Sequence, residues 1–203
     1  MSAATIAEES AHSGHADSTE FTAQPLGKVG IWWFLTSEIM VFGGLIGSYI
    51  LCRFANGGWE AERSHVNAKI AIFNTLVLLT SSFTIVEAHG AAEAKNQSKT
   101  RQYLLYTVLL GATFLCVKMF EYSIEISHGL TPASGLFWSF YYTMTGLHGF
   151  HVLIGVVANF MIWYALGTEK GWQTIRHRVE YAGLYWHFVD IVWIFLFPLV
   201  YLA

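Results

Sequence analysis

Residues 126–168 read ISHGLTPASGLFWSFYYTMTGLHGFHVLIGVVANFMIWYALGT, and none of them is Asp, Glu, Lys or Arg. A helix that crosses a bilayer needs about 20 predominantly apolar residues, so this stretch is long enough for one crossing. Pro132 suits the start of a helix or the residues just before it. The sequence therefore predicts a transmembrane helix over about residues 135–165.

Four further runs share this apolar character. They are residues 29–51, interrupted by Glu38; residues 70–86 and 103–117, which carry no charge; and residues 181–203, in which Asp190 is the one charged residue. Backbone polar groups cannot stay unpaired in lipid, so each run is predicted to be helical. No run shows the period-two alternation of an outer-membrane strand. We predict an all-α, polytopic membrane protein whose domain, residues 27–203, is a bundle of five transmembrane helices, over about residues 29–51, 70–88, 103–125, 135–165 and 181–202.

The composition of the chain agrees with a bilayer as its solvent. Of its 203 residues, 12% are charged and 54% hydrophobic, whereas soluble domains carry roughly 25% charged residues. Disorder is excluded, because it requires low hydrophobicity and high net charge. The net charge of −3 provides no basic surface, so no nucleic-acid partner is expected. Cys52 and Cys116 form no metal-binding or disulfide pattern.

The polar segments between the runs indicate the topology. Residues 1–26 are expected to form a flexible polar arm, which lacks the features of a signal or transit peptide. If the N-terminus is inside, the inner segments carry Lys28, Lys95, Lys99, Arg101, Lys170, Arg176 and Arg178, and the outer segments carry Arg53, Arg63 and Lys69. Cytoplasmic loops carry the excess of Lys and Arg. We therefore predict a cytoplasmic N-terminus and an external C-terminus.

Charged residues inside the predicted spans are candidates for function. Glu38 lies near the middle of the first span and should be protonated or paired, because a buried charge is costly. It is either a proton-responsive or lipid-contacting site, or a neutral acid bonded between helices. Lys118, Glu121 and Glu125 share a face of the third span, because residues three and four apart are neighbours on a helix. We interpret them as containing a self-neutralising pair near the outer membrane boundary.

Histidines gather in the last two spans. His148 and His151 lie three residues apart in the fourth span, and His187 and Asp190 three apart in the fifth. Histidines on two helices could ligate a haem, as in a b-type cytochrome. Polar residues in a helix bundle more often bond each other, so we prefer a polar cluster. A stand-alone transporter is a further alternative, although no internal repeat supports it.

The motifs that carry these residues resemble subunit III of the haem–copper oxidases, the cytochrome c oxidase subunit III family. The matching stretches, one in each predicted span and in family order, are SEIMVF (37–42), FNTLVLL (73–79), FEY (120–122), TGLHGFHVLIG (145–155) and YWHFVDIVW (185–193). The resemblance covers about residues 27–203. Many relatives have two further helices at the start, so the chain is similar to the shorter bacterial form.

The resemblance implies an accessory, non-redox subunit of a proton-pumping terminal oxidase, which reduces O2 to water in the bacterial inner membrane. It implies no catalytic centre in this chain: haems and copper are expected in oxidase subunits I and II, of which subunit I would be the main contact. Bound phospholipid is expected as well. Proton-related or lipid-contacting roles are implied for Glu38, Glu121, His148, His151, His187 and Asp190. The alternatives are a subunit III-like partner of a quinol oxidase or of a nitric oxide reductase.

Overall fold

The computed structural model describes residues 26–63, 66–175 and 178–202, and its regular elements are all helical. They are α2 (Leu26–Ala55), α3 (Glu60–Arg63), α4 (Ala68–Glu93), α5 (Gln97–Ser127), α6 (Leu136–Ala165), α7 (Glu169–Ile175), α8 (Arg178–Phe197) and a π-helical turn (Pro198–Leu202). Among the described residues, α2, α4, α5, α6 and α8 with its π turn are long and apolar enough to cross a membrane. The predicted all-α, five-span membrane protein is confirmed.

The helices extend beyond the predicted spans because their polar ends are capped. α5 begins at Gln97, whereas the apolar run begins at Tyr103. The side chain of Asn96 accepts a hydrogen bond from the backbone N–H of Lys99 at 3.1 Å. Asn67 caps α4 in the same way. An asparagine cap stabilises a first turn that stands in polar surroundings, whereas apolarity marks only the part of a helix inside lipid.

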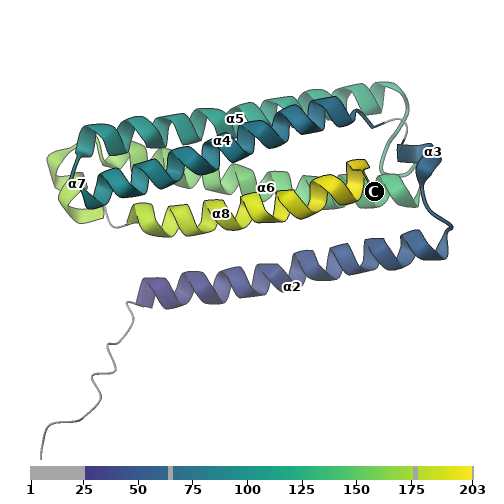
Figure 1. Cartoon of the computed structure of the whole chain (residues 1–203), viewed down its shortest axis with the longest axis horizontal. Helices are drawn as coiled ribbons and strands as arrows, with labels where there is room; N and C mark the ends of the chain where they lie inside the picture. The colour runs from purple at the N-terminus through teal and green to yellow at the C-terminus, as the bar shows by residue number, and fades with distance from the viewer. Residues whose placement is uncertain (1–25, 64–65, 176–177, 203) are drawn as a thin grey trace, which may run out of the picture.

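Two short helices, α3 and α7, lie in the connections and are not predicted by the apolar pattern. α3 follows α2, and α7 joins α6 to α8 (Figure 1). Both are too short and too polar to be recognised from hydropathy. The predicted arm, residues 1–26, lies outside the described residues except for Leu26, at which α2 begins.

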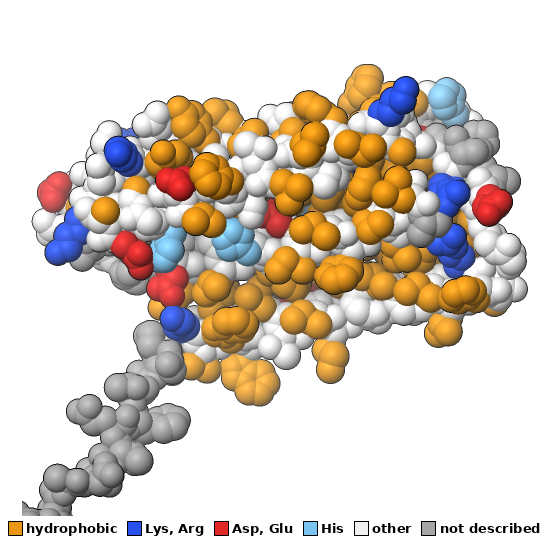
Figure 2. Space-filling view, viewed as in Figure 1, with side chains coloured by type: hydrophobic (Ala, Val, Ile, Leu, Met, Phe, Trp, Pro, Cys, Tyr) orange, Lys and Arg blue, Asp and Glu red, His pale blue; other side chains and the backbone are white. Residues whose placement is uncertain are grey.

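The five long helices do not contribute equally to the core. α4, α5, α6 and α8 form a four-helix bundle, and α2 runs along its edge beside α8 (Figure 1). In the apolar part of α2, 11% of the residues are buried, against 33–50% in the other spans. Hydrophobic side chains cover much of the middle of the molecule, while charged side chains gather towards its two ends (Figure 2). This is the surface expected of a protein whose middle lies in lipid.

Trp186 of α8 joins three other helices at the centre of the bundle. Its side chain is fully buried, and its indole N–H donates to Ser81 of α4 at 3.0 Å. The ring packs on Gly111 of α5 and Gly155 of α6, where an added Cβ would lie 2.6 Å and 2.7 Å from ring carbons. Small residues allow close helix packing in membranes. The glycines of α2 have no such neighbour, except Gly27, which approaches the ring of Tyr181.

Gly155→Val is expected to destabilise the bundle by about 1–3 kcal/mol, the usual cost of overpacking a core. The valine would displace Trp186 from the surface of α6. The matched control is Gly149→Val on the same helix, where an added Cβ has no neighbour within 4 Å. Thermal unfolding in detergent, followed by near-UV circular dichroism, compares the two variants. Equal stability of both would contradict the packing described here.

The C-terminal end of α8 changes its geometry at Pro198. Proline has no backbone N–H, and its ring collides with the carbonyl group four residues earlier in an α-helix. The α-helix accordingly ends at Phe197 and continues as a π-helical turn. This turn contains Tyr201, whose side chain is 5% exposed and enters the core. The last residues of the chain thereby reach a polar cluster on α5 and α6.

Candidate functional site

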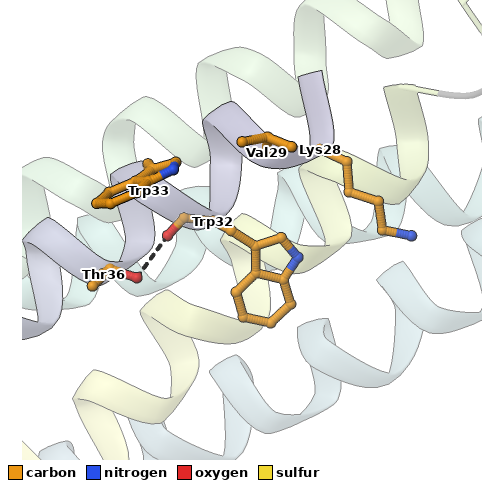
Figure 3. Close-up of a pocket in the computed structure, with 5 residues that line it drawn as sticks. All are labelled: Lys28, Val29, Trp32, Trp33 and Thr36. Atoms are coloured by element: carbon orange, nitrogen blue, oxygen red, sulfur yellow. Dashed lines mark hydrogen bonds between the residues drawn. The ribbon is translucent and has the colours of Figure 1, made fainter. Parts of the chain in front are cut away.

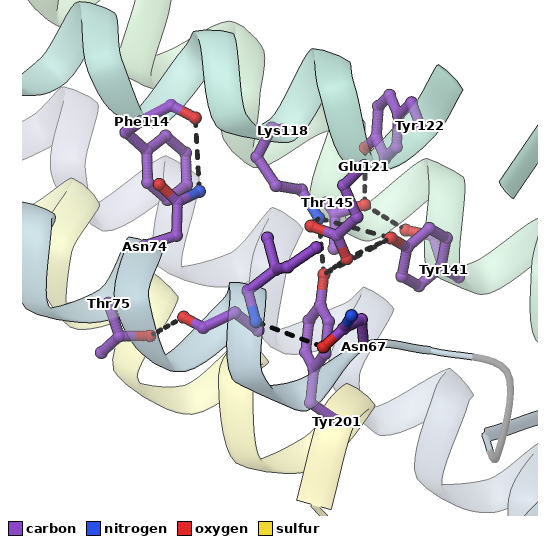
Figure 4. Close-up of polar contacts among 12 residues, drawn as sticks. Asn67, Asn74, Thr75, Phe114, Lys118, Glu121, Tyr122, Tyr141, Thr145 and Tyr201 are labelled. Carbon is purple, nitrogen blue, oxygen red and sulfur yellow. Dashed lines mark hydrogen bonds and ion pairs between the residues drawn. The ribbon is translucent and has the colours of Figure 1, made fainter. Parts of the chain in front are cut away.

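A buried ion pair lies at the centre of that cluster. Lys118 and Glu121 of α5 are 4% and 1% exposed, and Lys118 Nζ lies 3.1 Å from Glu121 Oε2. The other carboxylate oxygen of Glu121 accepts hydrogen bonds from Tyr141 Oη at 2.8 Å and Tyr201 Oη at 2.7 Å. Lys118 also donates to both tyrosine hydroxyls (Figure 4). Each polar atom of the pair therefore has a partner.

Aromatic rings surround the ammonium group of Lys118. Its Nζ lies 5.1–5.5 Å from the ring centroids of Tyr122, Tyr141, Trp193 and Tyr201. A cation within about 6 Å of an aromatic face is attracted by the ring quadrupole. We call Lys118, Glu121, Tyr141, Trp193 and Tyr201 the lysine cluster. It connects α5, α6, α8 and the π turn. Because its ion pair is fully hydrogen-bonded, we interpret the cluster as a contact that holds these helices together.

The sequence predicts part of the lysine cluster and misses the rest. The pair of Lys118 and Glu121 is present, and it is buried in the core of the bundle. Glu125 is also buried. The apolar pattern gives no sign of the two tyrosines, Tyr141 and Tyr201, which turn inwards to Glu121. One signal could have revealed the cluster: Trp193 stands in the middle of its span, too deep for an interfacial ring.

A second polar pair joins α2 to the bundle. Glu38 Oε2 of α2 lies 3.1 Å from His151 Nε2 of α6. The other ring nitrogen of His151 lies 2.8 Å from the carbonyl oxygen of Leu147 and must donate to it. Nε2 of a neutral ring therefore accepts, so the pair shares one proton between carboxyl and imidazole. The Glu38 side chain is 17% exposed, so this proton is closer to the surroundings than those of the lysine cluster.

Two of the remaining three candidates share a neighbour. His187 Nδ1 lies 2.9 Å from Ser82 Oγ of α4. The buried Asp190 lies next to the same Ser82. Among the described residues, neither ring nitrogen of His148 has a hydrogen-bond partner. The His148 ring stacks on Trp193 at a centroid distance of 5.0 Å. The four predicted residues of α6 and α8 are thus distributed over several contacts and do not form one polar cluster.

Apolar cavities separate α2 from the bundle. One of about 440 Å³ lies between α2 and α8 and includes His187 in its wall. A second, of about 730 Å³, lies between α2, α6 and α8 and is bordered by Asn159 and Arg178. A third, of about 510 Å³, is lined by residues of the first part of α2, among them Lys28 and Trp32 (Figure 3). Such apolar surfaces suit acyl chains or a partner helix.

Comparison with known proteins assigns the chain to a family. A family model described as cytochrome c oxidase subunit III matches residues 3–203. The chain is 35% identical to a cytochrome c oxidase subunit 3 of Corynebacterium diphtheriae over 85% of this chain and 86% of the relative. It is 34% identical to a protein of the same name in Thermostichus vulcanus, over 86% of each chain.

The chain is also similar to a relative whose name refers to quinol instead of cytochrome c. The chain is 31% identical to a "Probable quinol oxidase subunit 3" of Staphylococcus epidermidis, over 87% of this chain and 89% of the relative. The resemblance noted in the five motifs is therefore confirmed over nearly the full length. This chain belongs to the cytochrome c oxidase subunit III family, the third subunits of haem–copper oxidases.

Proposed function

We propose that this chain is an accessory, non-redox subunit of a terminal oxidase that reduces O2 to water and pumps protons. The observation that carries the proposal is the family match over residues 3–203. In this proposal subunit I is the main contact and subunit II a further partner, and these two hold the haems and copper. The distribution of His148, His151 and His187 over different neighbours favours this proposal over the b-type cytochrome. The continuous long helices give no support to a transporter with broken helices.

Two features of α2 support roles for the chain in proton uptake and lipid binding. Glu38 and His151 share a proton at the edge of the bundle, where α2 meets α6. A proton can pass between the carboxyl and the imidazole of such a hydrogen-bonded pair. The apolar cavities beside α2 suit phospholipid chains, which would fill the space between α2 and the bundle. Ordered lipid there would keep the neighbouring subunit closely packed.

The proposed partner is tested by co-purification. The apolar surface of α2 is mostly unburied and needs lipid or protein over a wide area. A tagged chain in its native membrane should purify in mild detergent with a larger subunit that carries the haem absorbance of an oxidase. A tagged membrane protein of unrelated function is the control. Recovery of this chain alone, folded and without oxidase subunits, would count against the proposal.

The electron donor distinguishes two forms of the proposed complex. The similarity to a quinol oxidase subunit favours quinol as an alternative to cytochrome c. The purified complex can be given either donor while oxygen consumption is recorded. Rapid consumption with quinol alone would assign the chain to a quinol oxidase. Reduction of nitric oxide instead of O2 would assign it to a nitric oxide reductase.

We further propose the bacterial inner membrane as the location, with the N-terminus in the cytoplasm. The start of α2, the connection between α4 and α5, and α7 lie at one end of the bundle (Figure 1), and this end carries most of the Lys and Arg residues outside the lysine cluster. Cysteine labelling with an impermeant maleimide should then modify Glu60→Cys, and Ser98→Cys only after the membrane is opened. Both cysteine variants are made in a protein in which Cys52 and Cys116 are replaced by serine. Labelling of Ser98→Cys in closed membranes, and of Glu60→Cys only after opening, would show the opposite topology.

A further inference from the structure

The apolar cavity between α2 and α8 is a groove that follows both helices. Its lining runs from Trp32 to Ile46 on α2 and from Leu184 to Phe195 on α8, which is about 21 Å and about 17 Å at a rise of 1.5 Å per residue. Phe42 in its lining is buried, whereas Trp32 and Phe195 are exposed. The groove therefore opens towards the lipid, and its volume of about 440 Å³ is typical of a small-molecule site.

One polar atom in the wall of this groove lacks a partner. Of the described lining residues, His187 alone has a side chain that readily accepts a hydrogen bond. Its Nδ1 lies 2.9 Å from Ser82 Oγ, whereas its Nε2 has no hydrogen-bond partner among the described residues and is not closed off by the protein. A polar group in apolar surroundings is costly unless it is hydrogen-bonded. The groove therefore favours a ligand that brings one hydrogen-bonding group to Nε2.

Ser82 and Asp190 determine which kind of hydrogen bond His187 can make. The buried Asp190 lies next to Ser82, and a serine hydroxyl donates one hydrogen bond. If Ser82 donates to the Asp190 carboxylate, its oxygen accepts from Nδ1–H of His187, and Nε2 is an acceptor. If Ser82 instead donates to Nδ1, Nε2 carries the proton and is a donor. The groove can therefore bind either a hydroxyl or a carbonyl group.

The depth and the charge of the groove restrict the ligand further. Among the described residues of its lining there is no Lys, Arg, Asp or Glu, so the ligand is neutral. His187 stands nine residues after Arg178, the first residue of α8, which places it about 14 Å along the helix. Acyl chains reach this depth but leave Nε2 unpaired. The rings of Phe42 and Phe188, with centroids 6.4 Å apart, provide aromatic surface for a planar ring.

We propose that this groove binds a membrane-dissolved quinol or quinone. Its ring hydroxyl or carbonyl oxygen is hydrogen-bonded to His187 Nε2, and its isoprenoid tail lies along α2 and α8. The ligand is held here and not oxidised, because the proposed function places the redox centres in other subunits. The site rests on that function only in placing the chain in a respiratory membrane, and it refines the lipid binding proposed above for this one cavity.

Photolabelling of the complete complex in nanodiscs tests the groove. The probe is an azido derivative of decylbenzoquinol, and labelled peptides of this chain are identified by mass spectrometry. We expect label on the lining segments of α2 and α8. Gly43→Leu should remove most of it, because Gly43 lines the groove and an added Cβ there has no neighbour within 4 Å. Gly44→Leu is the matched control, equally free of neighbours but outside the lining, and should leave the labelling unchanged.

The hydrogen bond is tested separately from the space. His187→Phe should weaken binding of the probe about five-fold, as expected for one lost hydrogen bond. His187→Gln keeps a group that donates and accepts, so it should have a smaller effect. Unlabelled decylbenzoquinol should displace the probe. Its dimethyl ether, which has the ring without the hydroxyls, and dodecanol, which has a hydroxyl without the ring, should displace it less.

Each outcome decides the question. Unchanged labelling in Gly43→Leu, or an equal loss in Gly44→Leu, would overturn the site. Equal displacement by dodecanol would overturn the assignment to a quinol and show a cavity for alkyl chains. If His187→Phe does not assemble, Gly43→Leu and the competitors still decide. The label is read on peptides of this chain, whereas the proposed function is read from the subunits that co-purify, so either can fail without the other.

Discussion

Lys118→Met is expected to destabilise the chain by about 3–5 kcal/mol, the cost of removing one partner of a buried ion pair. The variant leaves the Glu121 carboxylate, which is 1% exposed, with two tyrosine donors and no cation. A buried charge without a counter-charge is either desolvated at high cost or neutralised by a proton. The methionine fills most of the lysine volume, so the effect reports the charge and not a cavity.

A double variant separates charge from packing. Lys118→Met combined with Glu121→Gln removes both charges and keeps the shape of the cluster, so it should recover much of the lost stability. Lys99→Met, an exposed lysine on the same helix, is the control and should change stability little. The free energy of unfolding in detergent is measured by near-UV circular dichroism. A double variant as unstable as the single one would show that the ion pair is not what holds the cluster together.

The spans are predictable from the sequence because hydropathy alone determines them. A charge-free stretch such as residues 126–168 has few alternatives to a membrane helix. The rotation of each helix is less predictable, because both its lipid face and its core face are apolar. Which face of α2 meets the bundle is decided by contacts such as that of Glu38 with His151, 113 residues later. No local pattern in the sequence specifies such a pair.

The lysine cluster, too, depends on contacts between distant residues that the sequence does not specify. Lys118 and Glu121 are three residues apart on one helix, so their pairing follows from helix geometry. Tyr201 lies 80 residues beyond Glu121 and reaches it through the π turn at Pro198. Similarly, an added Cβ would have no neighbour within 4 Å at Gly43 or Gly47 of α2, whereas at Gly111 and Gly155 it would meet the ring of Trp186. The partner ring of Trp186, and not the glycine spacing, determines where helices meet.

Loss of this subunit is expected to leave initial oxygen reduction largely intact and to shorten the active lifetime of the complex. In the proposed function the redox centres lie in other subunits, so they stay assembled. Proton supply at high turnover and lipid packing are what this chain would contribute. Glu38→Gln keeps the shape of the pair with His151 but cannot exchange its proton, so it should give a milder form of the same decay. The matched control is Ser37→Ala, which changes the exposed side chain next to Glu38.

Oxygen consumption over successive turnovers, by the complex with and without this chain, is the most direct measurement. The accessory function predicts substantial initial activity without the chain, followed by inactivation during turnover that re-addition of the chain prevents. The haem spectrum should be unchanged at the start. A stripped complex with no initial activity and an altered haem spectrum would contradict the accessory function, and His148, His151 and His187 would then be tested as cofactor ligands.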